Sequence, residues 1–126
     1  MKLLLDTQVL LWVLTRPGRL SATTVDAIEA GENQIFVSMA SPWEISIKKS
    51  RGNLTPPDDL EFQLSERRFE LLPISLRHTQ AVAYLPHHHG DPFDRMLIVQ
   101  AQVDGLTLVT SDREIRRYPI SVLPAI

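Results

Sequence analysis

The sequence contains no cysteine, and this absence removes several classes of protein at once. A disulfide-stapled scaffold, a zinc site built on thiolates and a cysteine nucleophile are all excluded. A chain of 126 residues, 44% of them hydrophobic, can bury roughly two thirds of its unfolded surface without such cross-links. We therefore expect residues 1–126 to form a single domain, a common size for one.

Long hydrophobic runs are absent as well. The apolar stretches at residues 3–5 and 9–14 are separated by three polar residues, Asp6, Thr7 and Gln8. A secretory signal needs an unbroken apolar stretch, and a membrane-spanning helix needs about 20 apolar residues. The pattern therefore predicts a cytoplasmic protein without a membrane segment.

Neither a basic surplus nor a glycine-rich loop is present. The formal net charge is −2, whereas nucleic-acid-binding proteins usually carry an excess of basic residues. The five glycines form no cluster that could cradle the phosphates of a nucleoside triphosphate. Composition alone thus gives no sign of nucleic-acid binding and argues against the use of nucleoside triphosphates.

Strand-like and helix-like segments alternate along the chain. Short apolar or β-branched runs predict strands at residues 2–5, 34–38, 70–73, 106–110 and 120–123. Capping residues, prolines and glycines predict helices at residues 8–14, 21–30, 41–50, 56–68, 75–85, 91–105 and 112–117. This alternation is typical of the α/β class, with a mostly parallel sheet covered by helices on both faces.

Two aspartates follow expected strands. Asp6 comes immediately after the first strand, and only Ser111 separates Asp112 from the fourth. The carboxyl ends of parallel strands meet at one edge of the sheet, where binding sites in such folds lie. We therefore expect Asp6 and Asp112 to reach the same edge.

Two further acids lie near the starts of expected helices. The segments Ser41-Pro42-Trp43-Glu44 and Asp91-Pro92-Phe93-Asp94 share the order of capping residue, proline, aromatic residue and acid. This order predicts that Glu44 and Asp94 each occupy the third helical position. Asp94 also begins an apolar stripe with Leu97, so its carboxylate should face the core and needs a partner there.

Each acid taken alone also has a structural interpretation. Asp6 and Asp112 could cap the helices that follow them, and Ser41 with Glu44 has the form of a capping box. Four acids at one sheet edge, however, would repel one another unless a cation neutralised them. Oxygen ligands without cysteine or a histidine pair favour Mg²⁺ or Mn²⁺ over zinc, and such a centre suits phosphodiester hydrolysis.

Four segments together resemble the PIN-domain ribonucleases of the VapC toxin type. They run in the order of that family over nearly the whole chain: Leu3-Leu4-Leu5-Asp6-Thr7, Ser41-Pro42-Trp43-Glu44-Ile45 followed by Lys48, His89-Gly90-Asp91-Pro92-Phe93-Asp94-Arg95-Met96-Leu97-Ile98, and Leu108-Val109-Thr110-Ser111-Asp112. The resemblance implies a three-layer α/β/α sandwich around a five-stranded, mostly parallel sheet. It also implies an endoribonuclease that depends on Mg²⁺ or Mn²⁺. Such an enzyme is the toxin of a toxin–antitoxin module, forms a homodimer and is blocked by a VapB-type antitoxin.

The matching motifs suggest roles for the acids. Asp6, Glu44, Asp94 and Asp112 would form an acidic quartet, with Asp6 and Asp94 in direct contact with the metal. Glu44 and Asp112 would bind the metal through water or orient the attacking water. Asp91 is interpreted first as a helix cap and only second as part of the site.

Several residues near the quartet are candidates for RNA contact. Lys48 and Arg95 could bind phosphate, because phosphate contacts dominate affinity for nucleic acids. The alternative for Lys48 is favourable charge at a helix C-terminus. Thr7, Ser38 and Ser111 could hydrogen-bond to carboxylates or phosphate, or could instead satisfy the backbone at strand ends.

The histidines and tryptophans have more than one interpretation. His87, His88 and His89 are consecutive in a loop, so their side chains diverge and a shared transition-metal site is disfavoured. His89 could instead hydrogen-bond to a nearby acid or to substrate, and its role is left open. Trp12 and Trp43 are interpreted as core or interface residues. The first helix, apolar nearly all round, should be buried or packed against another subunit.

Two other functions compete with nuclease activity. An aspartyl-phosphate protein also gathers acids at strand ends, but it needs a lysine late in the chain, and the last lysine here is Lys49. A phosphatase of the dehalogenase type needs a second aspartate where this chain has Gln8. The remaining alternative is a catalytically silent module that binds RNA or protein and takes up no divalent metal.

Overall fold

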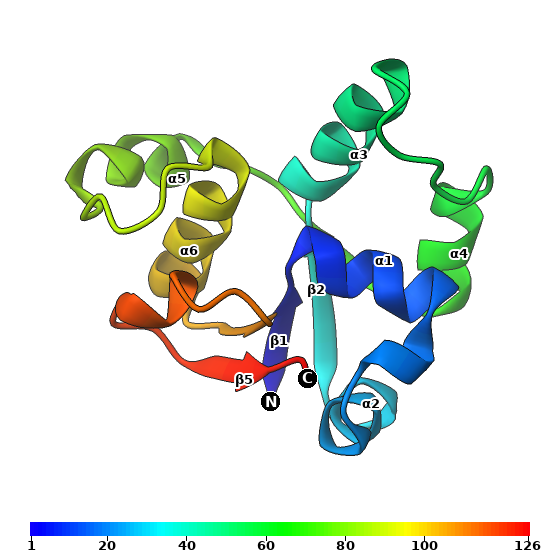
Figure 1. Cartoon of the computed structure of the whole chain (residues 1–126). Helices are drawn as coiled ribbons and strands as arrows, with labels where there is room; N and C mark the ends of the chain where they lie inside the picture. Colours follow the sequence, from blue (N-terminus) through cyan, green and yellow to red (C-terminus); the bar gives the residue numbers. More distant parts are fainter.

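All five strands are parallel and form one sheet in the computed structural model, which describes residues 1–126. The strands are β1 (Lys2–Leu5), β2 (Gln34–Ser38), β3 (Glu70–Leu72), β4 (Thr107–Thr110) and β5 (Val122–Pro124). Their order in the sheet is β3-β2-β1-β4-β5, so that β1 is central. Figure 1 shows β1 and β2 side by side at the centre of the molecule. The predicted α/β class with a parallel sheet is confirmed.

Six α-helices connect the strands. They are α1 (Thr7–Thr15), α2 (Ala22–Glu29), α3 (Ala40–Ser50), α4 (Leu60–Glu66), α5 (Leu76–Ala81) and α6 (Pro92–Asp104), with 3-10 turns at Pro17–Arg19, Val82–Tyr84 and Ile115–Arg117. Three segments are less helical than predicted: α4 begins only at Leu60, α5 ends at Ala81, and the segment after Asp112 forms a single 3-10 turn. None of the helices combines the length and the apolar character that a membrane span requires.

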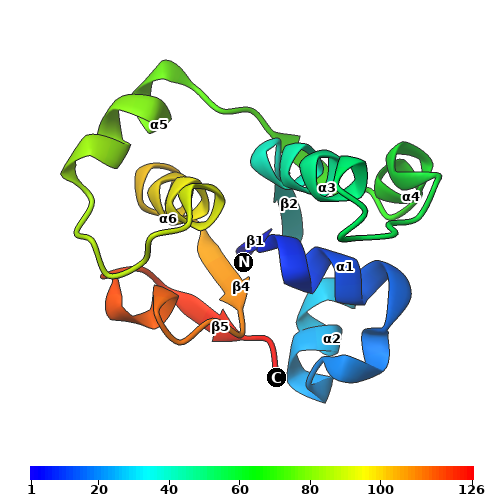
Figure 2. The ribbon, with the colours of Figure 1, turned by 45° about the horizontal axis from the view of Figure 1, so that its top comes forward.

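The helices cover both faces of the sheet and create the three layers that the resemblance implies. Leu3 and Leu5 of β1 face one core, and Leu4 faces the other, because successive side chains of a strand point to opposite faces. All three leucines are fully buried. Figures 1 and 2 show α1, α2 and α4 on one side of the sheet and α5 and α6 on the other, with α3 rising from the end of β2.

The strand order changes direction between β1 and β4. After β1 the chain enters α1, which packs in one core through Val9 and Leu10. After β4 it passes to the opposite core, where Ile115 and Tyr118 are buried. Such a divergence opens a crevice at the carboxyl edge, the usual place for a site in this kind of sheet. Asp6 and Asp112 both lie there, as predicted from their places after strands.

Gly105 sets the turn from α6 into β4 and offers a test of this geometry. It ends the helix in the left-handed conformation, with φ of 67°. We expect Gly105→Ala to lower the free energy of unfolding by ~1 kcal/mol, because a Cβ disfavours that conformation. Urea denaturation measures the change.

Gly31 supplies the matched control. An added Cβ meets no atom within 4 Å at either glycine, but Gly31 lacks a positive φ. Gly31→Ala should therefore change the free energy of unfolding by less than ~0.5 kcal/mol. Equal losses in the two variants would show that backbone conformation at Gly105 is not the cause.

Candidate active site

A polar cleft of about 480 Å³ opens at the carboxyl edge of the sheet, and all four predicted acids line it. They come from four separate segments: the end of β1, α3, the first turn of α6 and the loop after β4. The walls are formed by Asp6, Thr7, Gln8, Leu11, Glu44, Lys48, Asn53, Leu54, Asp91, Asp94, Ser111 and Asp112. The fold therefore brings together residues that are more than 100 positions apart in sequence.

Asp6 is both a helix cap and a wall of the cleft. Its Oδ1 accepts a hydrogen bond from the Val9 amide at 2.7 Å, which caps α1, and only 5% of the residue is exposed. Burial raises the pKa of Asp6 from 3.8 to about 6, and the charges of Asp112 and Glu44 act in the same direction. Hydrogen bonds from Thr110 and Val9 only partly offset this rise. The same side chain thus caps a helix and lines the cleft, so the structural interpretation does not exclude the functional one.

Asp94 lies three residues after the N-cap of α6 and lines the cleft. Asp91 is the N-cap of α6, with its Oδ1 accepting from the amides of Phe93 and Asp94. This cap places Asp94 at the third helical position, as predicted. Burial and the charge of Asp91 raise the pKa of Asp94 from 3.8 to about 7, although His89 lowers it. Near neutral pH, therefore, the Asp94 carboxyl is only partly ionised.

Glu44 reaches the cleft, but not from the predicted position. The helix begins at Ala40, whose amide donates to the Ser38 hydroxyl at 3.0 Å, so Glu44 is the fifth helical residue rather than the third. The predicted capping box of Ser41 and Glu44 is wrong, because the Ser41 hydroxyl lies inside the helix and pairs with Thr7 at 2.9 Å. Glu44 is released from capping and is free for other contacts.

Glu44 and Lys48 form an ion pair on one face of α3. Lys48 Nζ lies 2.7 Å from Glu44 Oε2, and the hydrogen bond raises the pKa of Lys48. The other oxygen, Glu44 Oε1, is buried and has no hydrogen-bond partner. Lys48 also feels the charges of Asp91 and Asp94. A single lysine thus faces a cluster of carboxylates and satisfies only one of the two Glu44 oxygens.

His89 completes the acidic cluster, a placement that the sequence left open. Its Nε2 lies 2.8 Å from Asp112 Oδ2 and 3.2 Å from Asp94 Oδ2. Burial lowers the pKa of His89, but the hydrogen bond to Asp112 and the charge of Asp94 outweigh it and raise the value. Burial raises the pKa of Asp112, but hydrogen bonds from His89 and the Glu114 amide outweigh it and lower the value. A hydrogen bond to a nearby acid is one of the two contacts that the sequence allows for His89.

Two candidates for contact with RNA lie elsewhere, and one of them, Ser38, instead satisfies the backbone at a strand end, the alternative that the sequence left open. Arg95 is 8% exposed, and its guanidinium donates to the backbone oxygens of residues 82, 85, 86 and 89 rather than facing the cleft. Its position directly after Asp94 turns it to another side of the helix. Ser38 is fully buried and accepts from the Ala40 amide. Thr7, Lys48 and Ser111 do line the cleft.

The residues at the cleft fit a hard divalent cation. Glu44 Oε1 is a buried acceptor without a partner, and such an atom costs about 1–3 kcal/mol unless something binds it. Burial is the main cause of the raised pKa values of Asp6 and Asp94, and the charges of neighbouring acids add to it. Carboxylate oxygens are the ligands that Mg²⁺ and Mn²⁺ prefer. A cation among these oxygens would therefore satisfy the unpartnered atom and relieve the repulsion.

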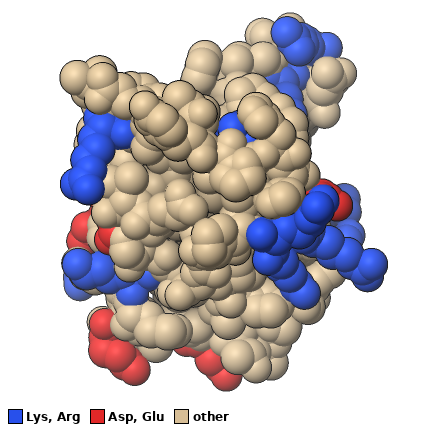
Figure 3. Space-filling model, turned by 90° about the vertical axis from the view of Figure 1, so that its left-hand side faces the viewer, with Lys and Arg blue, Asp and Glu red and all other residues tan.

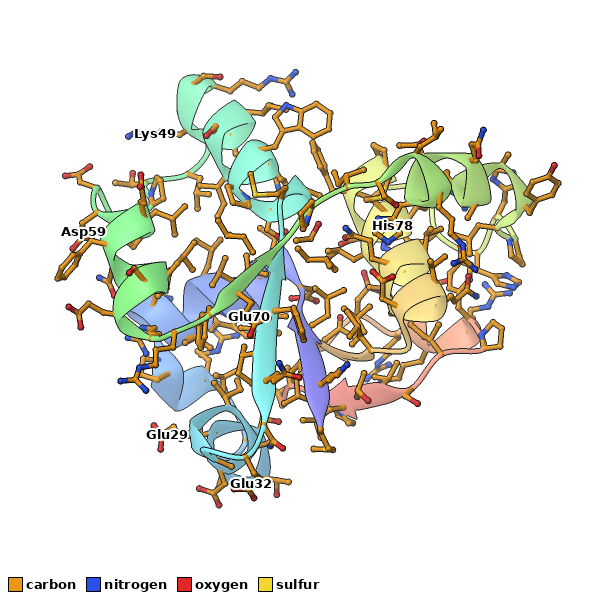
Figure 4. The ribbon with its side chains drawn as sticks, turned by 180° about the vertical axis from the view of Figure 1, so that it is seen from behind. Glu29, Glu32, Lys49, Asp59, Glu70 and His78 are labelled. Carbon is orange, nitrogen blue, oxygen red and sulfur yellow. The ribbon has the colours of Figure 1, made fainter.

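Charges outside the cleft are distributed differently. In Figure 4, the acids Glu29 and Glu32 lie at the end of the sheet remote from α3, and Lys49 lies on the outer side of α3. Figure 3 shows a face with Lys and Arg side chains toward its margins and a largely uncharged middle. Acids therefore also lie outside the cleft, at the opposite end of the sheet.

Comparison with known protein families gives one match along the chain. The model of the PIN domain family matches residues 3–120, which include all four acids of the cleft. No curated protein matches the sequence.

Solved structures similar to this one come from several bacteria. VapBC2 from Rickettsia felis, bound to a DNA fragment from its promoter, has a chain with a TM-score of 0.75 and 19% identity, covering 98% of each chain. DNA-bound VapBC from Salmonella typhimurium gives a TM-score of 0.68 and 20% identity over 98% of this chain and 97% of that one. A chain of a toxin–antitoxin complex from Klebsiella pneumoniae gives a TM-score of 0.65 and 18% identity over 96% of this chain and 95% of that one. These likenesses support the three-layer fold.

Asp6 caps α1 but carries a buried charge, so removing that charge should change the free energy of unfolding. The folded chain binds the Asp6 proton more tightly than the unfolded chain, so this carboxylate reduces stability as pH rises from about 4 to about 6. Asp6→Asn keeps the oxygen that accepts from Val9 but removes the charge. We expect it to raise the free energy of unfolding by ~1–3 kcal/mol at pH 8 in a chelator, and to change it little at pH 4.

Urea denaturation at the two pH values measures this effect. Asp26→Asn is the control, since Asp26 is an exposed acid on α2 outside the cleft. It should leave the free energy of unfolding within ~0.5 kcal/mol at both pH values. Destabilisation by Asp6→Asn at pH 8 would mean that its charge is already compensated within the fold.

Proposed function

The chain belongs to the PIN domain family, and from this membership we propose that it is an endoribonuclease that hydrolyses RNA phosphodiester bonds with Mg²⁺ or Mn²⁺. The observation that carries the proposal is the convergence of Asp6, Glu44, Asp94 and Asp112 on one cleft. The unpartnered Oε1 of Glu44 supports it, because helix capping alone gives no reason to bury that atom.

The four acids have different places in the proposed metal site. Asp6 and Asp94 would hold the cation directly, and its charge would oppose the burial and repulsion that raise their pKa values. Glu44 and Asp112 would contact it through water or orient the water that attacks phosphorus. When bound, a divalent cation polarises a phosphoryl oxygen and lowers the pKa of water, which is the chemistry that phosphodiester hydrolysis needs.

Three other residues at the cleft are suited to position the RNA backbone. Lys48 is half exposed and lies beside Glu44, so its ammonium can meet a phosphate at the mouth of the cleft. Ser111 lines the same cleft next to Asp112, and its hydroxyl can donate to a phosphate oxygen. Thr7 is held by Ser41, and this bond fixes the start of α1 beside Asp6. These residues bind and orient, while the acids provide the reactive centre.

We extend the proposal to the biological role of a toxin in a toxin–antitoxin module. The support is the ordered set of motifs and the likeness of the fold to chains in VapBC and toxin–antitoxin complexes. A VapB-type antitoxin would be the protein partner and would cover the cleft. The partly exposed apolar residues Leu11, Trp12 and Leu14 of α1 are available for the proposed homodimer.

The nuclease proposal predicts loss of RNA cleavage when the charge of Asp94 is removed. We expect the wild-type chain to cleave RNA in Mg²⁺ or Mn²⁺ but not in a chelator, and Asp94→Asn to be at least ~100-fold slower, a loss of about 3 kcal/mol of transition-state stabilisation. Sequencing of RNA 5′ ends after expression of each form measures the cleavage and locates the sites.

Asp58→Asn is the matched control for this experiment, because Asp58 is an exposed acid before α4 and outside the cleft. It should cleave like the wild type. If the wild type and Asp94→Asn gave the same RNA 5′ ends in equal amounts, the assignment of Asp94 to the active site would be wrong. Failure to take up Mn²⁺ in a calorimetric titration would favour the catalytically silent binding module instead.

Lys48 generates a separate prediction about RNA binding. If its ammonium meets a phosphate, Lys48→Gln should weaken RNA binding, and the slope of log affinity against log salt concentration should fall by about 0.7–0.9. Fluorescence anisotropy with a labelled RNA measures this, with Asp94→Asn present in every protein so that the RNA stays intact. Lys49→Gln is the control, since Lys49 lies on the outer side of α3 (Figure 4) and does not line the cleft. An equal loss in both variants would argue against a specific contact of Lys48.

A further inference from the structure

We propose that His89 is a positioning residue, whose ring holds the carboxylates of Asp94 and Asp112 in place without lining the cleft. Tyr118 and Arg95 in turn fix the loop that carries His89. The proposal rests on the proposed metal-dependent site but concerns residues outside its walls. His89 lies within hydrogen-bond distance of both carboxylates, yet it does not line the cleft. It acts through the acids and does not meet the substrate.

The hydrogen bonds of the imidazole ring determine which nitrogen carries the proton. The amide of Asp91 donates to Nδ1 at 3.0 Å, so Nδ1 is the acceptor in the neutral ring. The hydrogen must then lie on Nε2, which is also protonated in the charged ring. In either charge state Nε2 is therefore a donor toward Asp112 and Asp94. A nitrogen that carries a hydrogen has no lone pair for a metal, which excludes His89 as a ligand while this arrangement holds.

The backbone of His89 is fixed as firmly as its ring. Its amide donates to the Tyr118 hydroxyl at 2.9 Å, and its carbonyl oxygen accepts from Arg95 Nη1 at 3.2 Å. The amide of His88 also donates to the Tyr118 hydroxyl, at 3.0 Å. The same hydroxyl donates to the Pro86 carbonyl at 2.7 Å. Only Nε2 is left to reach the carboxylates.

Tyr118 and Arg95 belong to the elements that carry the two acids. Arg95 directly follows Asp94 on α6, and Tyr118 follows the 3-10 turn after Asp112. Both are buried, with 8% and 3% of their surface exposed. Their contacts to the loop are mainly to backbone atoms, so they fix its course whatever the neighbouring side chains are. The network therefore joins α6, the loop of residues 86–89 and the segment after β4 into one support for the acid pair.

A donor shared by two carboxylates has a clear physical effect. Asp94 and Asp112 would otherwise repel each other, and the shared N–H holds one oxygen of each on the same side. The second oxygen of Asp112 accepts from the Glu114 amide at 2.8 Å, so it is Asp94 that keeps an oxygen without a hydrogen bond, open to a cation. Residues that orient ligands in this way typically account for 10–100-fold in metal affinity. Arg95, predicted from the sequence to bind RNA, thereby acts on the site indirectly.

The protonation pattern of His89 gives the first test and needs neither RNA nor metal. In ¹⁵N-labelled wild-type protein, long-range proton–nitrogen correlations should show a protonated Nε2 and, in the neutral ring, an unprotonated Nδ1. Addition of Mg²⁺ should leave the hydrogen on Nε2. A hydrogen on Nδ1 alone, or loss of the Nε2 hydrogen when Mg²⁺ binds, would overturn the proposal.

Metal affinity gives the second test, by calorimetric titration with Mn²⁺. We expect His89→Ala to weaken Mn²⁺ binding by about 10-fold or more. His89→Gln should recover most of the loss, because its amide can donate from a similar position. Tyr118→Phe should show a smaller loss in the same direction. His87→Ala is the control, since His87 is exposed in the same loop and its side chain makes no hydrogen bond.

The outcomes separate this inference from the proposed function. Unchanged or tighter Mn²⁺ binding by His89→Ala, or a failure of His89→Gln to recover affinity while the variant remains folded, would contradict the positioning role. If instead the wild type binds Mn²⁺ and shows the expected protonation pattern but cleaves no RNA, the nuclease proposal fails and the positioning role stands.

Discussion

Burying several carboxylates together at the carboxyl edge of the sheet is the constraint around which the rest of the structure is arranged. Burial is the largest cause of the raised pKa values of Asp6 and Asp94, and neighbouring acids add to it. A fold that keeps these groups together despite the cost needs compensating contacts. It has them in the Val9 amide at Asp6, Lys48 at Glu44, and His89 at Asp94 and Asp112. The contacts of Lys48 and His89 leave Glu44 Oε1 and the second oxygen of Asp94 without a hydrogen bond, which is the condition for a cation to bind.

Helix capping and chemistry are not alternatives in this fold, because the same edge of the sheet serves both. Helix N-termini follow the carboxyl ends of the strands, so an acid there can cap a helix and face the cleft together, as Asp6 does. In α6 only Asp91 caps the helix, and although Asp91 also lines the cleft, Asp94 lies there without a capping role. This difference explains why a sequence motif with two acids three residues apart can have one structural member and one that is available for function.

Local sequence signals predicted the strands and helices that carry the site better than the contacts of individual side chains. The bounds of β1 and β2 and the caps of α2 and α6 follow from apolar runs and capping residues, and all four acids reach the expected cleft. The position of Glu44 in its helix was wrong because the Ser38 hydroxyl starts α3 earlier than Ser41 could. Arg95 was misjudged because its partners are backbone oxygens of a loop, and the course of that loop depends on Tyr118, far away in sequence. Long-range contacts to backbone leave no pattern in neighbouring residues.

The net charge of −2 is distributed unevenly between the cleft and the rest of the chain. Four of the 15 acidic residues line one cleft as the quartet, which leaves 11 against 13 basic residues over the rest of the chain. A divalent cation at the quartet would shift the balance further, since it neutralises charges that the fold already holds at a cost. Attraction of an RNA backbone would then depend on the metal: without it the cleft repels phosphate, and with it Lys48 and the cation present positive charge at the same point. Under the proposed function, metal binding would thus decide both whether RNA is cleaved and whether it can approach.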